Sequence, residues 1–189
     1  MKKVILVCGS PRYDGNTMTV LKACADAIEK LGVQAEIIDI GAMDIQSCLA
    51  CPVCQAEDFH CVRRDGANEL FAQIAEADGL IVAAPVYFGT ARGDMMNFLQ
   101  RLGRTSRRSG DFLDGMIGGP IAVARRGGHT ATIQEMLMFC FICGMIVPGS
   151  TYWNMVVAGE KDTAEQDEEG MATVLRFAGR VAELVKQLR

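Results

Sequence analysis

Four cysteines fall within fourteen residues of this chain, in the spacing C-x2-C-x2-C-x6-C: Cys48, Cys51, Cys54 and Cys61. The first three lie on one tight turn, and a short loop brings the fourth back toward them. A cubane iron–sulfur cluster needs such a set, because its cysteine ligands converge on a compact core from several directions. The spacing therefore predicts a [4Fe-4S] cluster, and with it one-electron chemistry.

Two other interpretations of these cysteines stay open. A structural zinc site also takes four cysteines, but usually as two separated C-x2-C pairs, and three cysteines at consecutive spacing would crowd a tetrahedral ion. The other interpretation is a loop of reduced thiols that binds no metal. Disulfides are disfavoured, because the chain runs from Met1 directly into a strand-like segment without a secretory leader, which indicates a reducing cytoplasm.

A second set of candidate residues follows the first strand-like run, at residues 9–17. Five residues separate Gly9 from Gly15, and the sequence matches neither a Rossmann nor a Walker A loop. Donor groups at a helix N-terminus can bind a terminal phosphate. Here the donors are hydroxyls, an amide and one guanidinium: Ser10, Arg12, Asn16 and Thr17. The alternative is a plain turn with Thr17 as the helix N-cap.

A third set lies in a loop after the most apolar short run, residues 80–84. An aromatic pair between proline and glycine forms a rigid ledge on which a planar ring can rest: Pro85, Val86, Tyr87, Phe88 and Gly89. We expect Pro85 to end the strand.

The next loop carries cations and paired glycines where backbone can approach a ligand closely: Arg126, Gly127 and Gly128. His129 follows and is expected at the surface, capping the next helix. Another C-x2-C pair, Cys140 and Cys143, has apolar neighbours and helical spacing, which predicts buried thiols. The same is expected of two further cysteines, Cys8 and Cys24.

Short β-branched runs alternate with amphipathic stretches along the chain, which predicts a parallel sheet covered by helices on both faces. Strands are expected at residues 4–7, 35–40, 80–84 and 121–124, with a fifth beginning at 145–147. Five strands and five helices indicate a flavodoxin-like, doubly wound α/β fold with strand order 2-1-3-4-5. Loops after the first, third and fourth strands then meet where the strand order reverses, so the three loop sets form one site.

The composition suits one globular domain over residues 1–189, with the cysteine loop (residues 46–65) inserted after the second strand. Half of the residues are hydrophobic and the net charge is −4, which argues against disorder and against nucleic-acid binding. No apolar run reaches the length of a membrane span. We therefore expect a cytoplasmic protein.

Three motifs together resemble a known family: Gly-Ser-Pro-Arg with Gly-Asn-Thr, Ala-Pro-Val-Tyr-Phe, and Arg-Gly-Gly after the first, third and fourth strands. They resemble the NADPH-dependent FMN reductase family, and with the cysteine loop the chain is similar to the iron–sulfur flavoproteins of anaerobic microbes. The resemblance extends from Lys3 to about Trp153. It implies that Ser10, Arg12, Asn16 and Thr17 hold the FMN phosphate, that residues 85–89 and 126–128 hold the isoalloxazine, and that the four loop cysteines hold the cluster.

The resemblance also implies an oxidoreductase that uses NAD(P)H or a ferredoxin-type donor and forms a homodimer or homotetramer. FMN would convert two-electron into one-electron chemistry, so no side chain need act as nucleophile or base. An NAD(P)H-dependent FMN or quinone reductase without a cluster, a non-enzymatic flavodoxin-like carrier and a zinc-stabilised flavin module are the alternatives. One departure concerns Arg63 and Arg64, since relatives usually carry two aspartates after the last cysteine. Cations beside a cluster raise its potential.

Overall fold

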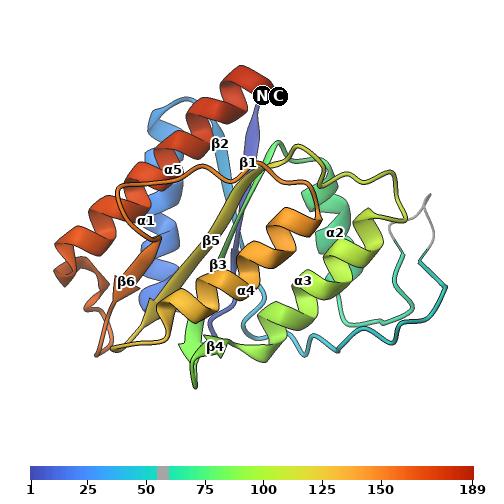
Figure 1. The fold of residues 1–189 in the computed structure, drawn as a ribbon, viewed down its shortest axis with the longest axis horizontal. Helices are drawn as coiled ribbons and strands as arrows, with labels where there is room; N and C mark the ends of the chain where they lie inside the picture. The colour runs from blue at the N-terminus through green and yellow to red at the C-terminus, as the bar shows by residue number, and fades with distance from the viewer. Residues whose placement is uncertain (55–59) are drawn as a thin grey trace.

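The computed structural model describes residues 1–54 and 60–189. The parallel strands within these residues follow the order β2-β1-β3-β5-β6, and their bounds are Lys3–Cys8 (β1), Gln34–Asp39 (β2), Gly79–Tyr87 (β3), Ile117–Ala124 (β5) and Met155–Val157 (β6). A two-residue strand, β4 (Thr90–Ala91), pairs antiparallel with the end of β3. Counted along the parallel strands, this order is the predicted 2-1-3-4-5, so the flavodoxin-like fold is confirmed (Figure 1).

Helices cover both faces of the sheet (Figure 1). Two of them pack together on one face: α1 (Asn16–Lys30) and α5 (Glu168–Leu188). Three cover the other face: α2 (Ala67–Ala75), α3 (Gly93–Ser106) and α4 (His129–Ile142). A short 3-10 turn, η1 (Ala164–Gln166), precedes α5. No helix in the described part of the chain is long and apolar enough to cross a membrane.

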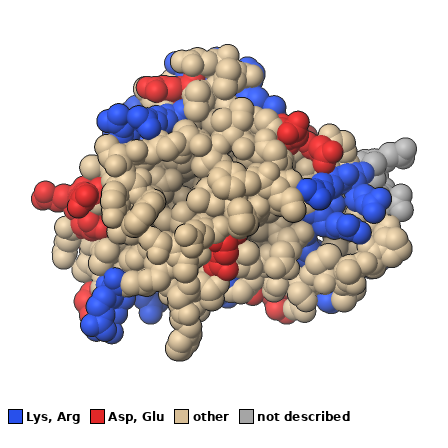
Figure 2. Space-filling view, viewed as in Figure 1, with Lys and Arg blue, Asp and Glu red and all other residues tan. Residues whose placement is uncertain are grey.

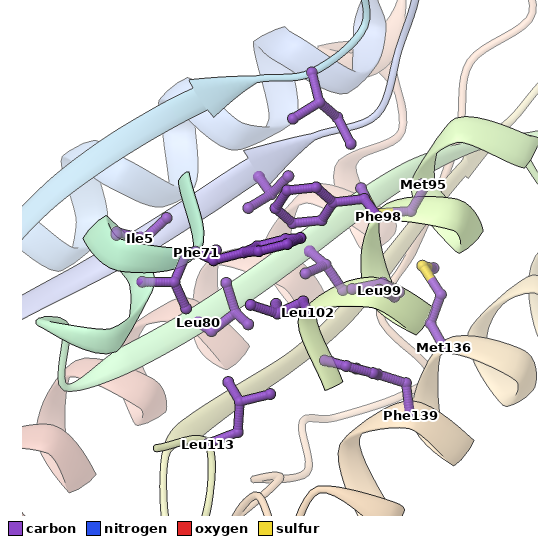
Figure 3. Close-up of a cluster of buried hydrophobic side chains, with 14 of the residues drawn as sticks. Ile5, Phe71, Leu80, Met95, Phe98, Leu99, Leu102, Leu113, Met136 and Phe139 are labelled. Carbon is purple, nitrogen blue, oxygen red and sulfur yellow. The ribbon is translucent and has the colours of Figure 1, made fainter. Parts of the chain in front are cut away.

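Alternation along the strands divides the core into two clusters, one on each side of the sheet. In β1, Val4 and Leu6 face α1 and α5, whereas Ile5 and Val7 face α2, α3 and α4. Figure 3 shows the cluster between the sheet and helices α2, α3 and α4, where the ring centroids of Phe71 and Phe98 lie 5.4 Å apart. Both faces of the central strands are therefore buried, as their near-continuous apolar sequence indicates.

Two expected strand boundaries are wrong. Pro85 does not end the third strand: β3 continues through it to Tyr87, and Pro85 pairs with Val123 of β5. Proline is tolerated there because β1 pairs with β3 only as far as Ala83, so beyond it the ladder needs no donor on that side.

The fifth parallel strand is likewise not at residues 145–147. Only Ile146 makes a bridge there, to Ile117, and Pro148 and Gly149 follow at once. The strand that pairs with β5 is β6, ten residues further along the chain. Proline and glycine favour a turn over continued pairing, which accounts for the shift.

Candidate functional site

A pocket of about 240 Å³ opens at the carboxyl edge of the sheet, and we call it the edge pocket. The loop after β1 and the carboxyl ends of β3 and β5 supply most of its walls, as expected at a point where strand order reverses. Seven predicted site residues line it: Ser10, Arg12, Asn16, Thr17, Pro85, Val86 and Tyr87. The structure therefore brings residues from two of the three predicted sets into one place, and their binding of FMN stays a prediction.

Five other predicted residues are not among the lining residues of the edge pocket: Phe88, Gly89, Arg126, Gly127 and Gly128. Their neighbour Arg125 lines it instead, and so do residues that sequence reasoning missed: Gly15, Val123, Ala124, Ala158 and Gly159. The last two follow β6, a strand that was expected elsewhere. That misplacement is why the fourth wall of the pocket was not anticipated.

Backbone contacts hold the first loop of the edge pocket in shape. The Ser10 hydroxyl accepts a hydrogen bond from the Arg12 N–H at 3.2 Å, and the Gly15 N–H donates to the Arg12 carbonyl at 3.1 Å. Gly41, just after β2, lies very close to this loop. A Cβ on Gly41 would come within 1.7 Å of the backbone carbonyl oxygen of Ser10. The loop is therefore wedged between its own turn and the β2 end, with little room to change shape.

The α1 N-terminus points its first turn at the edge pocket. Gly15 is the N-cap, and no side chain caps the helix within the described residues. Thr17 lies inside the helix and is buried, so the alternative that it serves as N-cap is wrong. The first N–H groups of a helix have no intrahelical partner, and together with the helix dipole they favour an anion at this position.

Asn16 is engaged with a distant segment. Its side-chain amide donates to the Glu160 carbonyl at 2.7 Å, and its side-chain oxygen accepts from the Thr163 and Ala164 N–H groups at 3.1 and 3.2 Å. The pair Lys161–Asp14 adds an exposed ion pair between the same two segments. Asn16 thus holds the residues after β6 against the edge pocket, a role that no local pattern indicates.

The β3–β4 hairpin projects beyond the carboxyl edge of the sheet (Figure 1). Phe88 at its tip is fully exposed and has a left-handed φ of 52°. Glu135 of α4 holds the hairpin in place, because its carboxylate accepts hydrogen bonds from the Thr90 hydroxyl at 2.6 Å and from the Ala91 N–H. The hairpin therefore presents an aromatic side chain on a braced support.

The loop after β5 packs directly on this hairpin. Gly128 has a φ of 91°, and a Cβ there would lie 2.7 Å from Val86 and 3.0 Å from Gly89. His129 is buried rather than exposed, and its Nε2 lies 3.0 Å from the Val156 carbonyl of β6. The expectation of a surface histidine is wrong because the first turn of α4 is covered by β6, which sequence reasoning did not place there.

The four cysteines of the cysteine loop lie near one another. Cys61 is buried, while Cys48, Cys51 and Cys54 are partly exposed. Burial raises the pKa of Cys54 and the other three thiols raise it further, whereas Arg104 acts against them. Residues 55–59 of the loop lie outside the described residues. Within the remainder, no three His, Cys, Asp or Glu side chains converge closely enough to hold a single metal ion.

Arg101 of α3 ties together both ends of the cysteine loop. Its buried guanidinium donates to the Gln46 carbonyl at 3.2 Å and forms a two-pronged ion pair with Asp65, in which Nη2 lies 3.0 Å from Oδ1. Asp65 in turn accepts from the Gln46 N–H at 3.0 Å. The guanidinium also lies over the ring of Phe71, 5.7 Å from its centroid.

Cys61 is fixed at two points. Asn68 donates to its carbonyl and accepts from its N–H, both at 2.9 Å. Burial acts to lower the pKa of the Arg101 guanidinium, but Asp65 and the Cys61 thiol outweigh it and raise that pKa. The last cysteine of the loop is thus positioned by α2 and α3 before any ligand is considered.

Two buried donors beside the cysteine loop lack acceptors. The Nε atoms of Arg63 and Arg101 have no hydrogen-bond partner in the part of the chain that the structure describes. A buried donor without an acceptor is costly, so such groups mark places where a further acceptor fits. The sulfurs of a thiolate-bound cluster are anionic acceptors. The donor set and its surroundings therefore fit an iron–sulfur cluster.

The remaining cysteines are packed away from this loop. Burial raises the pKa of Cys24 and Cys140 to about 12 and that of Cys8 and Cys143 to about 11. The prediction of buried thiols at these four positions is confirmed, because all four cysteines are buried.

The fold defines a flavodoxin-like protein with a pocket at the carboxyl edge of its sheet. The model of the NADPH-dependent FMN reductase family matches residues 2–160. The chain therefore belongs to that family of FMN-dependent oxidoreductases, as the sequence motifs implied.

Curated relatives agree with this assignment, and a solved structure agrees with the fold. An iron–sulfur flavoprotein of Methanocaldococcus jannaschii is 32% identical over 99% of both chains. Another from Methanosarcina thermophila is 30% identical, over 99% of this chain and 97% of the relative. The solved structure of a flavodoxin, WrbA-like protein from Agrobacterium tumefaciens has a TM-score of 0.70 at 15% identity, covering all of both chains, and supports the fold alone.

Proposed function

We propose that this protein passes electrons between a two-electron donor and one-electron partners through FMN and a [4Fe-4S] cluster. The observation that carries the proposal is the placement of the cysteine loop. It leaves the same edge of the sheet that holds the edge pocket, and Gly41, just before it, touches the Ser10 loop (Figure 1). Two relatives that align over nearly the whole chain are named iron–sulfur flavoproteins, which supports the same reading.

In this proposal the edge pocket holds FMN. Backbone N–H groups at the α1 N-terminus, with Ser10, Arg12 and Thr17, bind the phosphate, and Asn16 keeps the wall beside it in place. Residues 85–89 and residues 126–128 would hold the ring, and Gly128 packs the second segment against the hairpin. FMN, when bound, supplies the conversion between hydride and single-electron chemistry. The protein orients the cofactor and excludes water, and no side chain is assigned as acid or base.

Cys48, Cys51, Cys54 and Cys61 hold the cluster in this proposal. A zinc ion requires its sulfurs at about 2.3 Å from one centre. The spacing C-x2-C-x2-C-x6-C favours a cluster over zinc, because a structural zinc site usually takes two separated C-x2-C pairs. The cluster, when bound, supplies one-electron transfer. Arg101 and Asn68 keep Cys61 in position for it.

The partners follow from the same chemistry. We propose NAD(P)H or a ferredoxin-type protein as electron donor, and no nucleic acid or membrane partner. Met138, Phe141 and Ile142 project from α4 and are more than half exposed, and the face over α4 is mostly uncharged (Figure 2). Such a patch favours a homodimer or homotetramer. Eight unpaired cysteines fit a reducing, cytoplasmic setting.

Anaerobic purification followed by assays for FMN, iron, acid-labile sulfide and zinc tests the proposal. We expect one FMN and a stoichiometry of four iron and four sulfide per chain. Cys54→Ser is expected to lose iron and sulfide, whereas the matched control Cys24→Ala, a buried thiol of α1, keeps both. Zinc in place of iron, or thiols without metal in the wild-type protein, would contradict the cluster. Absence of FMN would contradict the whole proposal.

A second candidate function is an NAD(P)H-dependent FMN or quinone reductase that needs no cluster. The family match favours it, because that match is to an NADPH-dependent FMN reductase. Stopped-flow mixing of wild-type protein and Cys54→Ser with NADH, NADPH and a reduced ferredoxin distinguishes the two. Equal rates of acceptor reduction in both proteins would support the cluster-free enzyme. Reaction with reduced ferredoxin but with neither nicotinamide would support a flavodoxin-like carrier.

A further inference from the structure

Arg101 is the most deeply buried charged side chain of the cysteine-loop region. Only 1% of it is exposed, and within the described residues no other lysine, arginine, aspartate or glutamate is buried. A buried ion is costly unless charges and hydrogen bonds compensate it. Asp65 and the Gln46 carbonyl compensate the two terminal nitrogens, and the Phe71 ring covers one face.

The Nε atom of Arg101 has no such compensating partner among the described residues. That atom is buried without an acceptor among residues 1–54 and 60–189, while the same guanidinium interacts with the Cys61 thiol. Asp65 and the Gln46 carbonyl accept from the terminal nitrogens, so Nε is the donor of this guanidinium that stays without an acceptor among these residues. The guanidinium thus keeps one donor available on the loop that carries Cys61.

We infer that Arg101 is a positioning residue that sets the reduction potential of the cluster, with its Nε–H directed to sulfur on the Cys61 side. The inference rests on the proposed function, because it requires the cluster. One-electron reduction adds a negative charge to the cluster, and a buried donor stabilises that charge more than it stabilises the oxidised form. Asp65 opposes the effect through its own charge while it aims the guanidinium.

The alternative is that Arg101 only closes the loop. Potentiometric titration of the anaerobic, cluster-loaded protein, followed by electron paramagnetic resonance, separates these roles. Arg101→Lys keeps the charge but removes the Nε–H and the two-pronged geometry. At a fixed solution potential, we expect the ratio of reduced to oxidised cluster to fall about tenfold, the effect of losing one hydrogen bond to a charged group. Asp65→Asn removes the opposing charge and is expected to move the ratio the other way.

Arg64→Gln is the matched control. It removes one positive charge from the same loop, but Arg64 is exposed, so solvent and salt screen it. We expect its potential to stay at the wild-type value. Full iron and sulfide with an unchanged potential in Arg101→Lys would overturn the inference, and so would an equal shift in Arg64→Gln.

Failure of the inference is distinguishable from failure of the proposed function. Wild-type protein without iron and sulfide would remove the proposed function, and the inference with it. If Arg101→Lys loses the cluster or does not fold, Arg101→Gln, which removes both the Nε–H and the buried charge, carries the test, and an unchanged potential in that variant overturns the inference. A cluster-free readout is the rate of proteolysis within the cysteine loop. An unchanged rate in Arg101→Lys contradicts the positioning role. Faster cleavage is also expected if Arg101 only closes the loop, so the potential decides between the two roles.

Discussion

The edge pocket and the cysteine loop share one edge of the sheet but are stabilised differently. Backbone wedges such as Gly41 against Ser10 and Gly128 against Val86 shape the edge pocket. The cysteine loop instead depends on a few long-range side-chain contacts, chiefly the ion pair between Arg101 and Asp65. A site shaped by close backbone contacts is sensitive to added side-chain atoms, whereas a loop held by an ion pair is sensitive to the loss of one partner. Substitutions that add atoms in the edge pocket and substitutions that remove a partner at the cysteine loop therefore test the comparison.

Removing the anchor is expected to have the largest effect. Asp65→Ala leaves the Arg101 guanidinium buried and unpaired, and loss of one partner of a buried pair costs about 3 kcal/mol or more. The free energy of unfolding from urea titration measures this. The control is Asp14→Ala, which removes the acid of the exposed pair with Lys161 and should leave stability unchanged. Equal effects of the two changes would contradict a special role for the buried pair.

The anchor also predicts how stability depends on pH. Burial acts to raise the pKa of Asp65, but the hydrogen bonds with Arg101 and the Gln46 N–H outweigh it and hold that pKa below its ordinary value. A lowered folded-state pKa means that the contribution is complete above the ordinary value, about 4, and is lost as pH falls through the folded pKa. Urea titrations between pH 7 and pH 3 should show that loss in wild-type protein. Asp65→Asn should lack this component of the decline.

Adding a methyl group should damage the edge pocket. Gly128→Ala imposes a left-handed conformation on a residue with a Cβ and places that Cβ against Val86 and Gly89. We expect a loss of about 2 kcal/mol in unfolding free energy and weaker FMN binding, with the iron content unchanged. The neighbouring Gly127→Ala is the control, because a Cβ there meets no described atom within 4 Å. Loss of iron in Gly128→Ala would show that the two sites are not independent.

A substitution at Asn16 tests whether its side chain braces the wall of the edge pocket or binds the FMN phosphate. Asn16→Asp keeps an acceptor for the Thr163 and Ala164 N–H groups but adds a negative charge. If the side chain only braces the wall, FMN affinity from fluorescence titration should fall about tenfold or less, equivalent to about 1.4 kcal/mol. A much larger fall, restored at high salt, would place the side chain on the phosphate itself.

The smallest effect is expected at Phe88. Its side chain is fully exposed and its backbone is left-handed, so Phe88→Gly removes no packing and relieves strain. We expect unfolding free energy to change by less than about 1 kcal/mol, in the stabilising direction. A shift in the flavin absorption spectrum or in the oligomer mass by light scattering would show that this ring covers the cofactor or another subunit. A large loss of stability would contradict the exposed position.

Much of the fold could be predicted from local patterns. Period-two and period-3.6 apolar spacing located the strands and helices, and turn residues located the loops that form the edge pocket. The errors occurred where the local pattern was ambiguous. Pro85 stands in a strand because its neighbour β1 has already ended, and the fifth strand begins after the Pro148–Gly149 turn rather than before it.

The sequence by itself determined the fold class, the family and the cysteine spacing, because each depends on residues close together in the chain. Only the tertiary structure decided which groups support the two sites. Asn16 meets residues more than 140 positions away, and Arg101 meets Asp65 across 36. His129 is buried by β6, whose Val156 lies 27 positions further along the chain. Contacts between distant residues leave no period or motif in one sequence, so they emerge only when the packed elements bring those residues together.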